Sequence, residues 1–320
     1  MTVVPTTESR PQTLNYLENL TWRLATGVGR LPEEIREIHA HYLEASQLEN
    51  GGFGGREDGS DLYYTSFALR GLAITGKLVG TVAESAASFL RGQFHGQTPV
   101  IDFLSLLYSA KILESSAGID VLKDSQPDWQ QHVVATLAAC HREDGGYAKG
   151  PTSGRSSTYH TFLTLLCLEL LNTSPAAPER IVDFLHSQQR PDGGFVEFAP
   201  MRRSGTNPTA AAIGSLRILD RLSEDVRERT AQFFAGMQTL EGGLRANTRI
   251  PIADLLSSFT GLLTLLDLGS EDQIRLPELV TYVEQLADPE GGFHGAAWDE
   301  GKDVEYTFYG LGTLALLASC

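Results

Sequence analysis

The sequence predicts an all-α fold, an α6/α6 toroid in which six helical hairpins close into a double ring of twelve helices with an extra N-terminal helix. Two observations predict it. Amphipathic and nearly uncharged helical segments alternate along the chain. A Gly-Gly pair followed by Phe, Tyr or Leu occurs five times, with spacings of 94, 48, 49 and 49 residues, starting at Gly51, Gly145, Gly193, Gly242 and Gly291.

The glycine pairs divide the chain into six units. The first spacing is twice 47, so it leaves room for a degenerate unit without a glycine pair, around Gly96 to Leu113. We expect a loose tail over residues 1–12 and a helix from Gln12 to Gly29 ahead of the units, all within one domain, 1–320. The units are expected at about 31–77, 81–116, 127–172, 177–222, 224–268 and 273–320.

Each unit is expected to supply one outer and one inner helix. Stretches before the glycine pairs, such as 178–190 and 224–238, have one polar face and suit the outer layer. Stretches after the following loop, such as 159–171 and 305–319, carry almost no charge and need burial on most of their surface. The last inner stretch has no polar face to cap an open stack, which favours a closed ring over a solenoid. Strand signals are scarce.

The composition excludes several classes of protein. With 25 Lys+Arg against 40 Asp+Glu, the formal charge of −15 argues against nucleic acid as the main ligand. No apolar run reaches the roughly 18 residues of a membrane span, and the N-terminus does not resemble a signal peptide. The three cysteines are far apart and odd in number, which fits a reducing compartment. We therefore expect a cytoplasmic protein.

The loops of the three middle units are expected to form an anion site. In a closed ring all inner helices point the same way, so their positive ends and unpaired N–H groups meet these loops at one end of a central cavity. His160, at an inner helix start, is a further candidate to touch a diphosphate. The alternative is that these cations are solvated or cap other loops. Six cations stand in the three loops against Glu197 and Asp254, namely Lys149, Arg155, Arg202, Arg203, Arg245 and Arg249.

Aromatic residues gather in the first turns of the inner stretches. An apolar cavity with a basic mouth suits a long hydrocarbon that carries an anionic head group. Ordinary core packing is the alternative for each ring. The residues are Tyr63, Tyr64, Phe67, Tyr159, Phe162, Phe259, Tyr306, Phe308 and Tyr309, of which Tyr64, Tyr159, Phe162, Phe259 and Phe308 are the candidate cavity lining.

The segment QLENGGFGGREDGSDLYYTSFALRGL, repeated in register, resembles the β subunit of protein prenyltransferases and, more distantly, squalene-hopene-type cyclases. The resemblance implies an α/α toroid that accepts an isoprenoid diphosphate in its central cavity. It places the diphosphate at a basic rim that corresponds here to Arg202, Arg203, Arg245 and Arg249. It also implies a helical-repeat α subunit as partner, although nothing in the sequence identifies one.

The resemblance further implies a zinc ion held by an Asp, a Cys two residues later and a His. These positions fall on Asp254, Leu256 and Tyr306, so two of the three ligands are missing and we expect no zinc or other cofactor. Asp254 is a candidate general base or cation stabiliser, and equally a helix N-cap. Tyr306 is a candidate to face a carbocation or to donate a hydrogen bond.

Three functions stay open on the sequence. We favour an enzyme, a prenyltransferase-like protein without zinc-thiolate chemistry. The second is a toroid that binds an isoprenoid or lipid without catalysis. The third is a carbohydrate-active toroid, which needs two carboxylates in the cleft. Candidates for those carboxylates are Asp61, Asp254, Asp303 and Glu305. The Asp-rich motifs of terpene cyclases and synthases are absent from the sequence, as are a P-loop and a Ser-His-Asp elbow.

Overall fold

The computed structural model describes residues 14–93 and 100–320, so the expected tail over residues 1–12 lies outside the described residues. The helix expected from Gln12 to Gly29 is α1, Tyr16–Val28. The outer helices are α2 Glu33–Ala45, α4 Gly80–Gln93, α6 Trp129–Ala139, α8 Pro178–Gln188, α10 Glu224–Ala235 and α12 Leu276–Gln285. The inner helices are α3 Leu62–Ile74, α5 Val100–Ala117, α7 Thr158–Leu170, α9 Thr206–Ile218, α11 Leu255–Leu268 and α13 Val304–Leu317.

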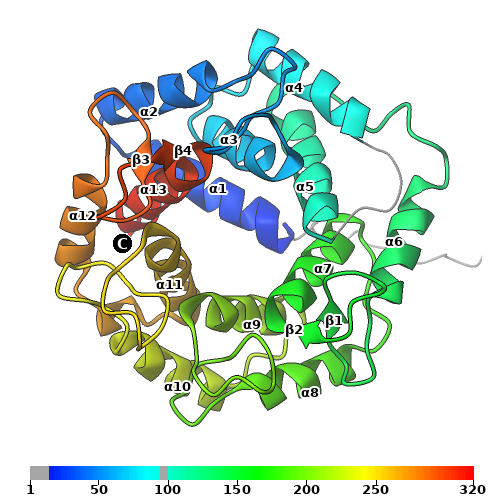
Figure 1. Ribbon diagram of the computed structural model, residues 1–320, viewed down its shortest axis with the longest axis vertical. Coiled ribbons are helices and arrows are strands. Elements are labelled where there is room, and N and C mark those ends of the chain that lie inside the picture. Colours follow the sequence, from blue (N-terminus) through cyan, green and yellow to red (C-terminus); the bar gives the residue numbers. More distant parts are fainter. Residues whose placement is uncertain (1–13, 94–99) are drawn as a thin grey trace, which may run out of the picture.

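The helices form a closed double ring (Figure 1). Each inner helix packs against the next inner helix, and α13 packs against α3, so the last unit meets the first. Each expected unit contains one outer and one inner helix. The all-α toroid predicted from the repeat is therefore confirmed.

The small amount of strand lies in the loops. β1 Tyr147–Ala148 pairs antiparallel with β2 Ser156–Ser157, and β3 Phe293–His294 pairs with β4 Lys302–Asp303. A short 3-10 helix, η1 Glu271–Gln273, precedes α12. The strands have two residues each, too few to give the period-two pattern by which a sequence announces a strand.

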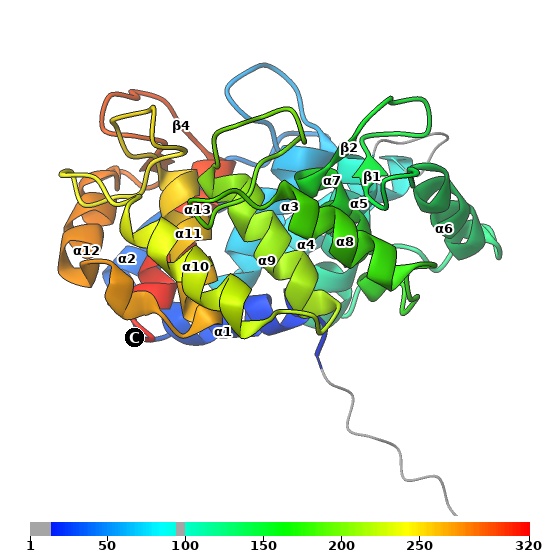
Figure 2. The same cartoon turned by 90° about the horizontal axis from the view of Figure 1, so that it is seen from below.

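The helix α1 closes one end of the ring. Figure 2 shows α1 at one end and the loops that lead into the inner helices at the other. The Tyr16 amide donates to Glu169 Oε2 at 2.9 Å, and Arg23 Nη1 donates to Asp267 Oδ1 at 2.7 Å. Asp267, whose side chain is 3% exposed, also pairs with Arg217. Both carboxylates sit near the C-terminal ends of inner helices, so α1 covers that end of the ring. We call the opposite, loop-lined end, which α1 does not cover, the open end.

The glycine pairs fasten neighbouring outer helices together. Gly193 has φ +88°, and a Cβ there would lie 2.1 Å from the carbonyl oxygen of Arg229 on α10. Only glycine allows both that backbone conformation and that approach. The first glycine of each other pair meets the following outer helix in the same way, and Gly291 meets Ile38 on α2, which closes the outer ring. The five contacts join Gly51 to α4, Gly145 to α8, Gly193 to α10, Gly242 to α12 and Gly291 to α2.

The helix α6 is the exception. The preceding unit has no glycine pair, and α6 borders a groove of about 1180 Å³. Phe103 and Leu106 of α5 lie on one side of this groove, and Val133 and Ala135 of α6 on the other. The part of the degenerate unit that the structure describes borders this groove. Its residues 94–99 lie outside the described part of the chain.

Candidate functional site

The open end of the ring is built from the N-termini of the inner helices. In four of them the N-cap side chain accepts a hydrogen bond from the backbone amide three residues further along the chain. Asp254 Oδ1 accepts from the Ser257 amide at 2.7 Å. The other three pairs are Asp61 with the Tyr64 amide, Ser157 with the His160 amide and Asp303 with the Tyr306 amide. Three of the four caps are carboxylates, which offset the positive ends of their helices.

The loops of neighbouring units satisfy further N–H groups. The Thr158 amide donates to Glu197 O at 3.1 Å, and the Leu255 amide donates to Gly295 O at 2.8 Å. The expectation of unpaired N–H groups at this end is therefore wrong for these helices, because each loop folds over the helix of the unit before it. At the start of α9 the Thr206 amide likewise donates to Ala246 O at 2.9 Å. The start of α9 differs in its cap: Gly205 offers no side chain, and the first turn contains no acidic residue.

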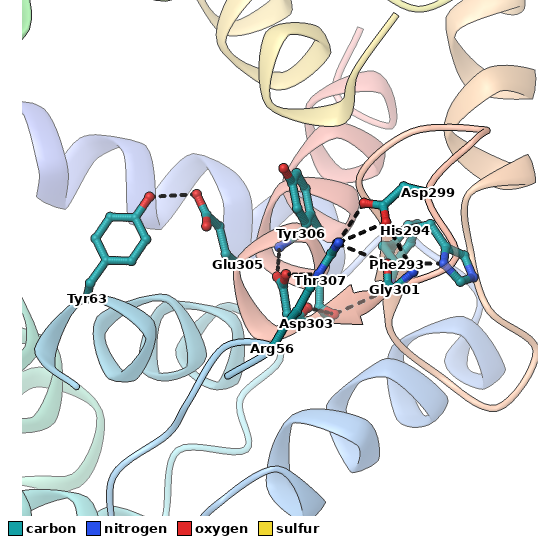
Figure 3. A network of polar contacts seen from close by, with 10 residues as sticks. All are labelled: Arg56, Tyr63, Phe293, His294, Asp299, Gly301, Asp303, Glu305, Tyr306 and Thr307. Atoms are coloured by element: carbon teal, nitrogen blue, oxygen red, sulfur yellow. Dashed lines mark hydrogen bonds and ion pairs between the residues drawn. The ribbon is translucent and has the colours of Figure 1, made fainter. Parts of the chain in front are cut away.

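Arg56 ties the first loop to the last (Figure 3). Its Nη1 and Nη2 donate to the two carboxylate oxygens of Asp299 at 2.8 and 2.7 Å, and its Nε donates to Asp303 Oδ2 at 2.9 Å. The guanidinium also lies 5.3 Å from the centre of the Tyr306 ring. The hydrogen bonds from Arg56 lower the pKa of Asp299. The sequence pattern had pointed to no role for Arg56 beyond its place in the repeat.

Glu305 points from the first turn of α13 toward α3, where it meets Tyr63 (Figure 3). The Tyr63 hydroxyl donates to Glu305 Oε1 at 2.6 Å. Burial raises the pKa of the Glu305 carboxyl, while the Tyr63 hydrogen bond and the nearby charge of Arg70 act in the opposite direction. On the sequence alone, Glu305 was a candidate only as one of the carboxylates of a carbohydrate-active toroid. Its neighbours on α3 come from the other end of the chain.

Aromatic rings fill the inner layer beside Glu305. Phe67 lies 5.2 Å from Tyr309 and 5.6 Å from Phe308 between ring centres. Phe259 lies 5.3 Å from Tyr309 and 5.6 Å from Phe308. Phe67, Phe259, Phe308 and Tyr309, which we call the aromatic cluster, come from α3, α11 and α13 and are all buried. Two residues of the expected cavity lining, Phe259 and Phe308, are therefore packed against each other.

The other expected lining residues lie apart from the aromatic cluster. Tyr64 packs over Gly55, and Phe162 packs over Gly214 and meets Tyr16 of α1 with the ring centres 5.7 Å apart. Tyr159 is 36% exposed at the start of α7. Tyr159 therefore remains accessible at the open end, whereas Phe162 also supports α1.

Arg70 lies beyond the aromatic cluster, toward α1. Its guanidinium is 4.6 Å from the ring centre of Phe67 and 4.7 Å from that of Tyr108. Its Nε is buried without a hydrogen-bond partner among the described residues. The Tyr108 hydroxyl in turn donates to Leu17 O of α1 at 3.2 Å. Arg70 sits in the middle of the apolar helix α3, far from the loops in which the sequence pattern predicted functional cations.

The cations predicted to bind an anion are placed in different ways. Arg202 and Arg249 are exposed in the loops before α9 and α11, and Arg203 Nη1 donates to Thr248 Oγ1 at 3.0 Å. Arg245 Nη2 donates to Gly236 O, at the C-terminus of outer helix α10, at 2.8 Å. His160 Nδ1 contacts Ser157 Oγ at 2.8 Å, and burial lowers the pKa of its imidazole, which favours the neutral ring.

The positions that correspond to the family's zinc ligands do not fit a zinc ion. Asp254 already accepts from the amide and the hydroxyl of Ser257, at 2.7 and 2.8 Å. Leu256 has no donor atom, and the Tyr306 ring packs on Gly295 beneath Arg56. Within residues 14–93 and 100–320, no three His, Cys, Asp or Glu side chains are grouped to hold a metal ion.

A family model described as the prenyltransferase α/α-toroid domain matches residues 13–97 and 109–320. The β subunit of protein farnesyltransferase from Pisum sativum is 27% identical over 198 residues, which cover 59% of this chain and 45% of that protein. The matched segment thus spans less than half of that relative.

Two solved structures share the fold at low identity. Candida albicans protein geranylgeranyltransferase-I, solved with GGPP, matches with a TM-score of 0.68 and 16% identity, over 88% of this chain and 91% of that one. A type II terpene cyclase from Scytonema, solved with geranylgeranyl dihydroxybenzoate, matches with a TM-score of 0.64 and 14% identity, over 94% of this chain and 99% of that one.

Proposed function

Because this chain belongs to the prenyltransferase α/α-toroid family, we propose that it binds an isoprenoid diphosphate along the axis of the ring and transfers the prenyl group without zinc. The observation that carries the proposal is Glu305, a half-buried carboxylate hydrogen-bonded to Tyr63 and placed beside the aromatic cluster. A proton acceptor thus stands beside a buried group of aromatic rings in the inner layer of the ring.

The diphosphate binds where the acidic caps are missing. The start of α9 carries no carboxylate, and Arg202, Arg203, Arg245 and Arg249 lie in the two loops around it. His160 on the neighbouring helix adds a donor if its free nitrogen carries the proton. The hydrocarbon then runs inward beside the aromatic cluster, and α1 limits its depth. Because α1 closes the opposite end of the ring, the ligand enters from the loop-lined end.

The chemistry follows from the groups near the prenyl carbon. An acceptor hydroxyl loses its proton to the Glu305 carboxylate as its oxygen bonds to C1 of the prenyl group. The C1–O bond to diphosphate breaks, and its electron pair leaves with the diphosphate. Burial raises the pKa of Glu305, which makes it a better proton acceptor than an exposed carboxylate. The faces of Phe259, Phe308 and Tyr309 stabilise positive charge that develops on the allylic carbon.

Asp254 and Tyr306 take supporting roles in this proposal. Both carboxylate oxygens of Asp254 accept hydrogen bonds from Ser257, so Asp254 acts as the N-cap of α11. Tyr306 lies between Arg56 and Gly295 and shapes the acceptor side of the site. No zinc enters the mechanism. Metal analysis of the purified protein that finds about one zinc per chain would contradict this part.

The test combines calorimetry with farnesyl and geranylgeranyl diphosphate and a turnover assay with a panel of hydroxyl acceptors. Glu305→Gln is expected to bind the diphosphate like the wild type and to lose about 10²–10⁴-fold in turnover. Glu300→Gln, the same change at an exposed residue of the preceding loop, is the matched control. If neither diphosphate binds, the proposal fails. If one binds but no acceptor is prenylated, the chain is a non-catalytic isoprenoid-binding toroid.

The carbohydrate-active alternative finds less support. Asp61, Asp254 and Asp303 all cap inner helices, and Asp303 is also paired with Arg56. Glu305 is then left without a second carboxylate for acid and base roles. A helical-repeat α subunit as partner and a cytoplasmic location remain proposals from the family likeness and the cysteine pattern. None of the described helices is long and apolar enough to cross a membrane.

A further inference from the structure

Two adjoining loops at the open end expose apolar side chains between arginines. Met201 is 44% exposed, and Ile250 and Ile252 are 38% and 37% exposed. The loops touch: Arg203 bonds to Thr248, and the Thr206 amide donates to Ala246 O at 2.9 Å. We call the exposed set the rim patch; it comprises Phe198, Met201, Arg202, Arg203, Arg249, Ile250 and Ile252.

The rim patch has the opposite charge to the rest of the molecule. It holds three arginines and no acidic residue, in a chain with a formal charge of −15. The acidic residues nearest in sequence, Glu197 and Asp254, are partly buried. Asp254 caps α11, and the carbonyl of Glu197 accepts from the start of α7. The exposed charge of the patch is therefore wholly positive, and it is interleaved with apolar side chains.

We propose that the rim patch docks on an anionic bilayer surface, with the open end of the ring facing the lipid. Apolar side chains enter the boundary between head groups and acyl chains, while arginines pair with lipid phosphates. A protein partner fits less well, because protein interfaces gather their apolar residues in a core with a polar rim. Here the exposed apolar side chains come from two loops, each of which also carries exposed arginine, and the loops project from the end of the ring (Figure 2).

The rim patch shares Arg202, Arg203 and Arg249 with the proposed diphosphate site. The proposal is therefore tested at its apolar side chains, which the proposed function does not use, and on vesicles without isoprenoid diphosphate. It predicts which vesicles the full chain binds. In co-sedimentation at low salt, the protein is expected to bind vesicles of phosphatidylcholine with phosphatidylserine, and to bind phosphatidylcholine alone at least about tenfold more weakly. Added salt is expected to release it, because screening weakens the arginine contacts.

The apolar side chains provide the decisive variants. Met201→Asp with Ile250→Asp is expected to weaken vesicle binding by at least about tenfold, with an unchanged melting temperature because both residues are exposed. Leu240→Asp is the matched control: Leu240 is 105% exposed and lies outside the rim patch, so vesicle binding is expected to stay within about twofold.

Three results would overturn the proposal. The first is no binding to the anionic vesicles at low salt. The second is equal binding by the wild type and the double variant. The third is capture of a helical-repeat protein that the double variant loses while its vesicle binding is unchanged, which would make the rim patch a protein interface.

Discussion

Two junctions of the outer ring differ in how they are closed. Between α8 and α10, Gly193 brings the backbone of one unit against the Arg229 carbonyl of the next. Between α4 and α6 the chain has no glycine pair, and a groove of about 1180 Å³ opens beside α6. The helices on both sides are otherwise alike in length and kind. Backbone contact at glycine therefore distinguishes the α8 to α10 junction from the one beside the groove.

The glycine repeat does more than allow the chain to turn. A turn alone would tolerate Asn or Asp in the left-handed region, as Asn172 and Asp220 show elsewhere in the chain. At Gly193 the approach of a neighbouring carbonyl excludes every side chain. The repeat thus records packing between units. The described part of the second unit lacks this backbone contact, and the unit also lacks the glycine pair.

The largest effect is expected from replacing the glycine that makes this backbone contact. Gly193→Ala places a Cβ 2.1 Å from Arg229 O at a residue with φ +88°, so the α8 to α10 junction has to open. We expect the free energy of unfolding to fall by about 3–5 kcal/mol, measured by urea denaturation. Gly154→Ala is the control, since no atom lies within 4 Å of its Cβ; its stability is expected to change by less than about 0.5 kcal/mol. Equal losses in the two variants would contradict the packing role.

A smaller effect is expected at the junction that closes the ring. Arg56→Gln removes the cation from Asp299 and from Asp303, whose side chain is 3% exposed. We expect a loss of about 1–2 kcal/mol at neutral pH, because the buried Asp303 carboxylate keeps the Tyr306 amide but loses its cationic partner. Lys111→Gln, which breaks an exposed pair with Glu114 within one helix, is expected to cost less than about 0.5 kcal/mol.

The pH dependence of the Arg56 effect has a definite sign. Arg56 lowers the pKa of Asp299, so the folded state holds that proton less tightly than the unfolded state. The stabilisation is present above the ordinary Asp pKa of 3.8 and is lost as the pH falls through the lower pKa of the folded protein. Wild type and Arg56→Gln are therefore expected to differ most near neutral pH and to converge in acid. A constant difference down to the acid range would assign the effect to packing.

The sequence predicts the ring because the period and the two kinds of helix are local patterns. Asp254 as an N-cap was also predictable, because the cap and its acceptor are three residues apart. The position of α1 was not. Its anchors, Glu169 and Asp267, lie 153 and 244 residues from their partners on α1. No local pattern carries a contact of that range.

The candidate site shows the same limit. The basic loops could be found by counting charges, but the direction of each arginine could not. Arg245 turns to the C-terminal carbonyls of α10, as Arg190 does to Ser187 O at the end of α8. Glu305 and Arg70 matter because the closed ring brings α3 beside α13, and only three-dimensional packing makes that pairing.

The smallest effect is expected at the groove beside α6. Ala135→Leu adds a larger side chain on α6 facing the groove, where there is room for it. We expect the free energy of unfolding to change by less than about 0.5 kcal/mol. Ala231→Leu makes the same change on α10, where the alanine is 7% exposed and the junction is closed. There we expect a loss of about 1–3 kcal/mol from overpacking. If Ala135→Leu costs as much as Ala231→Leu in urea denaturation, the α4 to α6 junction is as tightly packed as the others, and the missing glycine pair does not explain the groove.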